Sequence, residues 1–263
     1  MNYKYIYLAF LCCTSTVFGQ SDTYPFIPGE TVKYDVYYHW GLLWVNVADV
    51  IFITEKTNYN GQDVWYLKAT GATHPFYDMF YQVRDTFETR LTFPGFDPLW
   101  FRRVLHHKKW FSSHEYFFDH VKKEIVSNIN RGGRVSSVKY DYTLGIHDIL
   151  SSAYHFRGYD YESLKPGQKV EFTMLIDNKT DSLYFIYQGI EKIKTRNKRT
   201  FSCHKVLVSL LEGDFFPGQQ EMTVWFTADK NRVPVLAEAK ILVGSVRGII
   251  KEENTLKYPL MPE

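Results

Sequence analysis

Histidine is the residue type in this sequence whose spacing most readily suggests chemistry. Four of the nine histidines, His106, His107, His114 and His120, lie close together along the chain and could surround a metal ion. However, His106 and His107 are adjacent, so they would point to opposite faces of a strand, and no nearby cysteine or carboxylate completes a known ligand spacing. We interpret these histidines as surface side chains, and we predict no metal site and no cofactor.

Two further groups could supply a nucleophile. Cys203 precedes His204, but neighbours on one strand face opposite ways, so the thiol and the imidazole cannot share a proton directly. His147 could reach Ser151 on a helix, yet no nucleophile elbow is present and no acid is placed to orient the imidazole. Capping of a helix start explains Asp148 more simply. We therefore expect a buried, inert Cys203 and predict no catalytic residue.

Basic and aromatic side chains also gather locally. The basic residues from Lys192 to Arg199 crowd one expected turn and could contact a phosphate, although charge at a turn is usually solvated. Tryptophans could line a lipid or sugar cavity or simply fill a core. At residues 75–80 the alternation of strands breaks, and Pro75 suits the first turn of a short helix that would act as a plug or flap. The candidate ligand-binding residues are Phe76, Tyr77, Met79, Phe80, Trp44 and Trp65.

The elements that must position these residues are mostly strands. Apolar and polar residues alternate from Val32 to Tyr38, which is the period of a strand with one buried face. Asn60-Gly61 is a strong hairpin signal between two further alternating runs. The whole chain predicts a mainly β fold, an antiparallel, strongly curved sheet or barrel of about a dozen strands with one or two short helices. The best helix candidate spans residues 146–157, with Gly158 as its cap.

The chain begins with a segment typical of export. Lys4 precedes an apolar stretch from Ile6 to Phe18 that ends at the small residue Gly19, so residues 1–19 are predicted to be a signal peptide. Residues 20–263 are then one β-rich domain, with no transmembrane segment in the mature chain. Pro28-Gly29 and Pro166-Gly167 each precede an expected alternating strand. This similarity raises the alternative of two similar halves, about 25–145 and 160–258, joined by the 146–157 helix.

Net charge argues against one class of partner, and cysteine content excludes an internal disulfide. The net charge is +2, and loss of Lys4 with the leader lowers it to +1, too near neutral to argue for a nucleic-acid partner. Cys12 and Cys13 lie within the leader, so the mature chain keeps a single cysteine and cannot form an internal disulfide. Aromatic residues make up 17% of the chain, and they favour half-buried sheet surfaces.

Five motifs occur in order along the chain: Phe26–Glu30, Val83–Asp85, His147–Ser152 with Tyr154 and Arg157, Val224–Asp229 and Arg232–Val235. Together they resemble the exported domain-of-unknown-function family numbered 3108. The likeness covers nearly the whole mature chain, in order. It implies a secreted or envelope protein of a Gram-negative bacterium, and it assigns no activity and no catalytic residue. At the level of the fold there is also a likeness to the half-barrel periplasmic carriers of lipoproteins and other amphiphiles.

Three functions remain open at this point. The first is a non-enzymatic envelope protein, periplasmic, associated with the outer membrane or secreted, that binds a lipid-like or amphiphilic ligand in a β-barrel or half-barrel cavity. The second is a structural or interaction module that docks on an outer-membrane or cell-wall partner. An exposed aromatic patch or a free edge strand would support this function. The third is a hydrolase of envelope polymers that uses His147, Asp148 or the histidine group.

Overall fold

The structure, a computed structural model, describes residues 24–177, 179–196, 198–210, 221–241 and 243–263. The expected signal peptide lies outside the described residues. Fifteen strands form one sheet that is antiparallel except where β9 pairs parallel with β10. The predicted fold class is confirmed, although the sheet does not close, because it ends at β8 on one edge and at β9 on the other.

The first part of the chain contains a run of long strands and one short helix. They are β1 (Glu30–Trp40), β2 (Leu43–Tyr59), β3 (Gln62–Thr73), α1 (Pro75–Tyr81), β4 (Val83–Thr92), β5 (Pro98–His107), β6 (Trp110–Asp119), β7 (Glu124–Arg131) and β8 (Arg134–Asp141). The helix predicted after Pro75 is confirmed as α1. Asn60 and Gly61 have φ values of 52° and 83°, as expected for the two-residue hairpin turn that this pair predicts.

The second part of the chain starts with β9 at one edge of the sheet, and its later strands lie progressively closer to the middle. It comprises β9 (Ile146–His147), α2 (Ile149–Arg157), a short 3-10 helix (Tyr161–Ser163), β10 (Lys169–Ile176), β11 (Lys179–Lys194), β12 (Thr200–Ser209), β13 (Glu221–Thr227), β14 (Pro234–Lys240) and β15 (Ser245–Ile250). The predicted helix is therefore confirmed, but it begins three residues later than expected, because residues 146 and 147 pair with β10.

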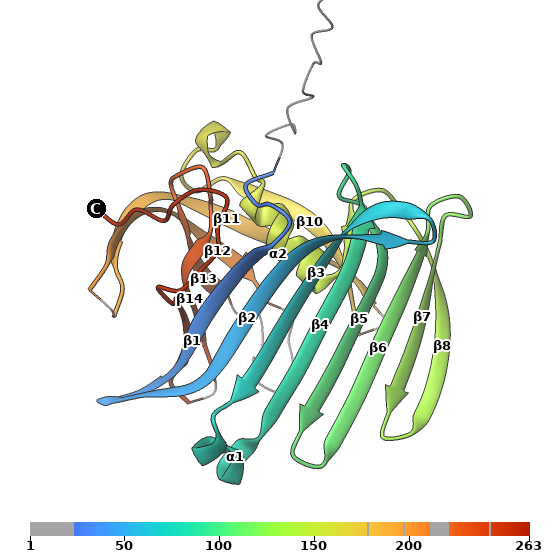
Figure 1. Cartoon of the computed structure of the whole chain (residues 1–263), viewed down its shortest axis with the longest axis horizontal. Helices are drawn as coiled ribbons and strands as arrows, with labels where there is room; N and C mark the ends of the chain where they lie inside the picture. The colour runs from blue at the N-terminus through green and yellow to red at the C-terminus, as the bar shows by residue number, and fades with distance from the viewer. Residues whose placement is uncertain (1–23, 178, 197, 211–220, 242) are drawn as a thin grey trace, which may run out of the picture.

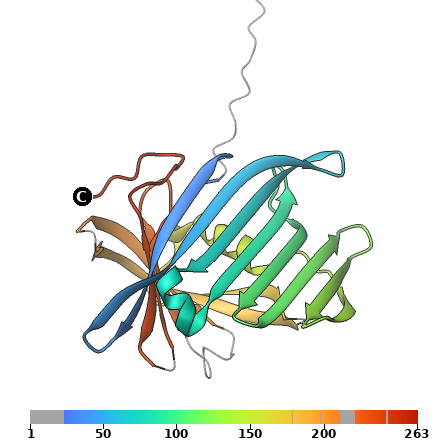
Figure 2. The same cartoon turned by 60° about the horizontal axis from the view of Figure 1, so that its bottom comes forward.

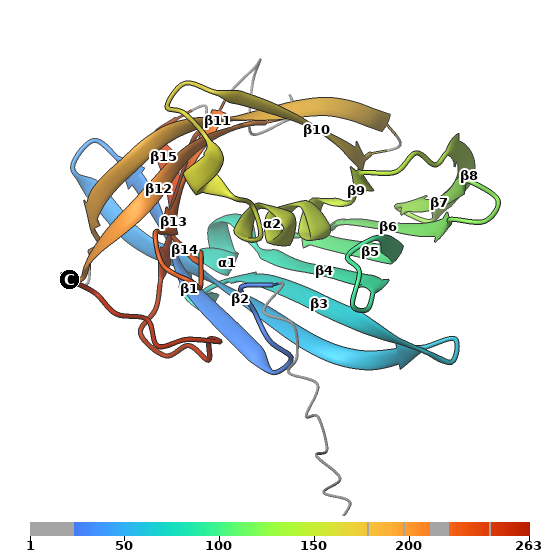
Figure 3. The same ribbon diagram turned by 90° about the horizontal axis from the view of Figure 1, so that it is seen from above.

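The strands form two meanders, which are joined by pairing between the first and the last strand of the chain. Strands β1 to β8 lie in chain order, β15 back to β10 lie in reverse order, and β1 pairs with β15 to join the two runs. The sheet curls so that the two runs face each other across α2, which lies inside the curve (Figures 2 and 3). The β1–β2 turn, α1 and the β5–β6 and β7–β8 turns lie together at one end of the sheet, here called the α1 end (Figure 1).

Alternate residues of each strand face the inside of the curve and form the core. On the β3 to β7 side, Leu67, Leu91, Phe101, Tyr116 and Ile125 are buried and pack with residues of α2. The second run contributes a separate cluster around Phe156 and Tyr161 that includes side chains of β11, β12 and β13. A third cluster contains Cys203 and lies where the C-terminal residues Leu256 and Leu260 pack against the sheet. Helix α2 is therefore held from both sides.

Candidate functional site

The inner face of the sheet encloses a cavity of about 620 Å³ between α2 and the α1 end. Its wall is formed mostly by apolar side chains on neighbouring strands, because inward positions recur at every second residue. Residues of α2 cover it on one side. The apolar wall includes Val36, Val50, Val208, Met222, Val224 and Ala237, and α2 contributes Ile149, Ser152, Ala153 and Phe156.

One side of the cavity carries charge. Arg103 on β5 and Asp177, which directly follows β10, both line it and form an ion pair. Arg103 is 8% exposed, whereas the Asp177 side chain is 50% exposed. Arg131 and His114 approach the same Asp177 oxygen at 3.5 and 3.6 Å. Among the described residues, no hydrogen-bond partner is found for the Arg103 Nε. The cavity thus has an apolar wall and a small polar cluster.

The polar cluster has a surplus of positive charge. Burial, and then the nearby Arg103 charge, lower the pKa of His114 to about 4, so its imidazole is neutral near pH 7. Two guanidinium groups, Arg103 and Arg131, then face the single carboxylate of Asp177. A buried arginine is a strong hydrogen-bond donor to a carboxylate or phosphate group. The cluster can therefore accept a second anionic group.

Helix α2 is fixed at its N-terminus by one buried carboxylate. Asp148 accepts hydrogen bonds from the backbone N–H groups of Leu150 and Ser151 at 2.8 and 2.9 Å, which caps the helix. Its second oxygen accepts from the Thr89 hydroxyl on β4 at 2.9 Å. The predicted capping role of Asp148 is confirmed, and the same carboxylate holds the helix against the sheet.

The C-terminal part of α2 is fixed by a buried ion pair. Arg157, 4% exposed, pairs with Glu30 on β1, which is fully buried, and also donates to the Asn231 carbonyl at 3.2 Å. Burial raises the pKa of the Glu30 carboxyl, and the Arg157 guanidinium beside it acts in the opposite direction. Tyr154 accepts a hydrogen bond from Thr54 on β2 at 2.9 Å. Several residues of the sequence motifs therefore position the helix that covers the cavity.

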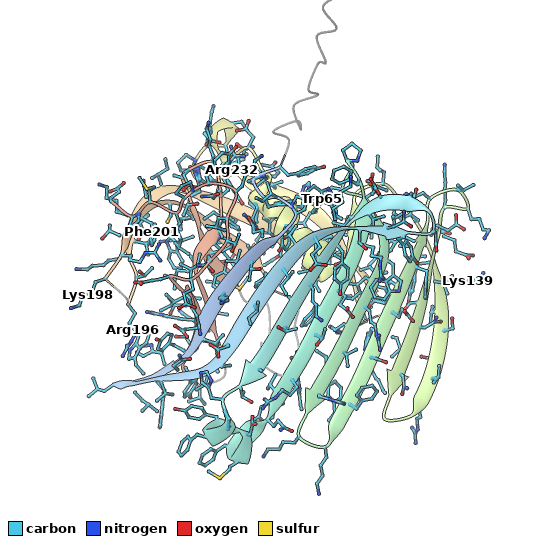
Figure 4. All side chains as sticks on the ribbon, viewed as in Figure 1. Trp65, Lys139, Arg196, Lys198, Phe201 and Arg232 are labelled. Atoms are coloured by element: carbon cyan, nitrogen blue, oxygen red, sulfur yellow. The ribbon has the colours of Figure 1, made fainter. Side chains whose placement is uncertain are left out.

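The six candidate ligand-binding residues lie elsewhere. Phe76, Met79 and Phe80 on α1 are exposed, and Tyr77 beside them is half-buried. Trp65 is buried near α2 and contacts Phe26, with ring centroids 5.4 Å apart (Figure 4). None of the six is among the residues that line the cavity.

Trp44 lies on the outer face of the sheet because of a register shift. Pairing of β1 with β2 shifts between Val36 and Tyr37, and a bulge of this kind moves the following side chains to the opposite face. Trp44 accordingly packs under Arg247, with the guanidinium 4.6 Å from its ring, and near Tyr37, whereas Val50 on the same strand lines the cavity. The alternation of apolar and polar residues along β2 does not reveal this change from the inner to the outer face.

Arg103 and Asp177 were not recognised from the sequence. A usable signal exists for Arg103, since it shares its parity on β5 with Phe101 and Leu105 and would be expected to face inward with them. Asp177 lies in a turn with a φ of 49° and carries no comparable signal. Its proximity to Arg103, which lies 74 residues earlier, follows only from the way the two runs of strands face each other.

The histidines considered for a metal site are dispersed. His107 pairs with Asp85 at 3.0 Å, His120 lies 2.7 Å from the Pro98 carbonyl oxygen, and His114 belongs to the polar cluster. His106 is exposed. Within the part of the chain that the structure describes, no group of three or more His, Cys, Asp or Glu side chains is placed to hold a metal ion.

The candidate nucleophiles and the basic turn also have structural explanations. Cys203 is fully buried, and burial raises the pKa of its thiol to about 12, in agreement with the inert residue predicted. His204 contacts the Tyr187 hydroxyl at 3.1 Å. At the β11–β12 turn, Arg196 stacks on Tyr37 and Trp44, while Lys198 lies at the tip (Figure 4).

These features define an open, β-barrel-like protein whose curved sheet and inner helix enclose a largely apolar cavity. The chain belongs to the family described as "Protein of unknown function (DUF3108)", whose model matches residues 33–251. The family resemblance drawn from the sequence motifs is confirmed. No curated protein matches the chain in sequence.

A solved structure supports the fold. The chain is similar to the β-barrel-like protein of domain of unknown function DUF1849 from Brucella abortus, with a TM-score of 0.54 and 8% sequence identity. The similarity covers 86% of this chain and 97% of that chain. At this identity the likeness concerns the fold alone. Among the described residues there is no helix of sufficient length and apolarity to cross a bilayer.

Proposed function

We propose that this protein is a non-enzymatic binding protein that holds a lipid-like or amphiphilic ligand in the cavity under α2. The observation that carries the proposal is the cavity itself, with about 620 Å³ of space and a mostly apolar wall. Ligand pockets commonly have volumes of roughly 300–1,000 Å³ and combine an apolar lining with a few polar groups. The apolar part of the ligand would lie against β1, β2 and β12 to β14, with its polar end near Arg103.

The proposal predicts that a side chain added at Gly248 blocks binding. Gly248 on β15 lines the cavity, and a Cβ at this position would meet no atom within 4 Å. The ring of Gly248→Phe should therefore point into the cavity and occupy part of it. We expect the variant to bind the fluorescent fatty acid parinaric acid at least about ten-fold more weakly than the parent protein, because one tenfold change corresponds to about 1.4 kcal/mol of lost burial.

A matched variant separates blocking from loss of the fold. Thr86→Phe adds the same side chain on β4, at a position that alternates with the inward-packed Phe87 and thus faces outward. It should bind parinaric acid like the parent. If Gly248→Phe, still folded by circular dichroism, bound as tightly as the Thr86→Phe protein, cavity binding would be refuted.

We also propose that the protein acts outside the cytoplasm, in the periplasm, at the outer membrane or in a secreted form. The sequence pattern of residues 1–19 supports export. The mass of the chain purified from the cell envelope tests this, since removal of residues 1–19 leaves Gln20 as the first residue. A chain that keeps residues 1–19 and fractionates with the cytoplasm would exclude export.

A second candidate function is an interaction module for an envelope protein. The observation in its favour is β8, an edge strand on which every residue except Tyr140 is exposed. Such an edge can pair with an extended segment of another protein. Ser137 alternates with the residues of β8 whose N–H groups bond to β7, so Ser137→Pro would remove a backbone donor from the free edge. It should abolish capture of an envelope partner while leaving binding of parinaric acid unchanged.

A further inference from the structure

The α1 end of the sheet carries exposed aromatic side chains that the cavity does not use. Six aromatic residues among those described count as exposed, and five of them lie at this end, between 43% and 65% exposed. They come from three separate connections, the β1–β2 turn, α1 and the start of β6. We call this surface the rim and define it by Trp40, Leu42, Phe76, Met79, Phe80, Tyr81, Lys108, Lys109, Trp110 and Arg134.

Helix α1 is held with its apolar side outward. Asp78 accepts hydrogen bonds from Arg84 on β4 and from the Thr73 hydroxyl at the end of β3, so the polar side of the helix faces the sheet. None of the residues of α1 is buried, and Phe76, Met79 and Phe80 project to the outside. A helix on a water-soluble surface normally turns its apolar stripe toward the core. The reversed orientation indicates an apolar or interfacial partner.

Positive charge accompanies these apolar residues. Lys108 and Lys109 form the exposed β5–β6 turn next to Trp110, and Arg134 is exposed at the β7–β8 turn. No ion pair is found for these three side chains within the described ranges. The acidic residues nearby are already paired, Asp78 with Arg84 and Asp85 with His107. The rim therefore offers free cations between aromatic side chains.

This combination fits a lipid surface better than a protein groove. Trp, Tyr and Phe favour the boundary between headgroups and acyl chains, and lysine and arginine beside them are attracted to anionic lipids. The three connections also end at one side of the molecule, so they can reach a plane together (Figures 1 and 2). The cavity extends from α2 toward the same side, since its wall includes Asp177, which lies 3.5 Å from Arg131 at the end of β7, beside the β7–β8 turn.

We propose that the rim docks on an anionic bilayer, with the aromatic side chains of α1 and Trp110 in the interface and Lys108, Lys109 and Arg134 against the headgroups. The cavity then faces the membrane. This docking goes beyond ligand binding and does not depend on it. Gly248→Phe, which should block the cavity, is expected to bind vesicles like the parent protein.

Vesicle co-sedimentation tests the docking. The probes are vesicles of phosphatidylcholine alone and of phosphatidylcholine with phosphatidylglycerol, and all proteins are residues 20–263, because the apolar residues 6–18 would bind lipid by themselves. We expect binding to the anionic vesicles only, weakened by added salt. Lys108→Ser/Lys109→Ser should bind roughly thirty-fold more weakly, and Phe76→Ser/Phe80→Ser at least about ten-fold more weakly.

Matched controls lie at the opposite end of the sheet. Val121 and Leu144 are 93% and 83% exposed, and Lys122 and Lys123 are exposed beside Val121. Val121→Ser/Leu144→Ser and Lys122→Ser/Lys123→Ser should bind as the parent does. All four variants replace exposed residues, so thermal unfolding should match the parent. Absence of vesicle binding by the parent, or an equal loss in the control variants, would overturn the proposal and favour a protein partner at the rim.

Discussion

At the scale of the residue, the position of Arg103 bears most directly on the chemistry of the proposed ligand. Its guanidinium is buried at the wall of an otherwise mostly apolar cavity, and its Nε lacks a hydrogen-bond partner in the described part of the chain. Asp177, its carboxylate partner, lies in a turn and is half exposed to solvent. A ligand carboxylate or phosphate could take the place of Asp177 beside the Arg103 guanidinium. The arrangement favours an anionic amphiphile over a neutral one.

This reasoning predicts a selective defect in Arg103→Met. The variant keeps an unbranched side chain but loses the charge, so binding of parinaric acid should weaken about ten-fold or more, as expected for a lost hydrogen bond to a charged group. Binding of the methyl ester of parinaric acid should stay within about two-fold of the parent. Fluorescence titration of both probes gives the comparison.

The neighbouring residue supplies the control. Arg102 is exposed on the outer face of β5, so Arg102→Met should bind both probes normally. Equal weakening of the acid and its ester in Arg103→Met would show that the residue shapes the cavity wall and does not select the headgroup.

At the scale of the element, α2 depends on two buried carboxylates that tie it to different strands. Asp148 connects its start to β4, and Glu30 connects its end to β1 through Arg157. The contacts of Arg157 with the rings of Phe26 and Tyr154, at 5.4 and 5.6 Å, add to the same attachment. The helix is therefore a fixed cover of the cavity, positioned by residues that lie far apart in the sequence.

Arg157→Met tests this attachment. The substitution leaves Glu30 buried without its partner, and the loss of one member of a buried pair typically costs about 3–5 kcal/mol of unfolding free energy. Urea unfolding measures the change. Lys139→Met breaks the exposed Lys139–Glu124 pair, which spans 3.0 Å, and should cost no more than about 1 kcal/mol. Comparable losses in the two variants would contradict the role given to the buried pair.

Some elements could be predicted from the sequence and others could not. Long alternating strands, the Asn60-Gly61 turn, α1 and most of α2 follow from local periodicity and turn chemistry. Strand β8 carries no such signal, because almost all of its residues are exposed and no buried parity marks it. Trp44 was a candidate because tryptophans can line a cavity, and the bulge that places it on the outer face cannot be read from alternation. The cavity itself depends on pairing between β1 and β15, which are more than 200 residues apart.

At the scale of the whole molecule, the order of the strands explains why a cavity exists. Two meanders that meet at β1 and β15 bend toward each other, and α2 fills only part of the space between them. The edges at β8 and β9 stay apart, so the sheet is not a closed barrel whose interior is fully packed. The cavity and the aromatic rim are then oriented toward the same end. A binding protein that exchanges its ligand with a membrane would need this arrangement.

Native mass spectrometry of the protein, purified gently from the envelope of its own host, tests the central claim most directly. The parent and Gly248→Phe proteins would be compared, and any bound small molecule identified after organic extraction. The account predicts a stoichiometric amphiphile on the parent chain and none on Gly248→Phe. A parent chain without a small molecule, or the same molecule bound equally to Gly248→Phe, would contradict it.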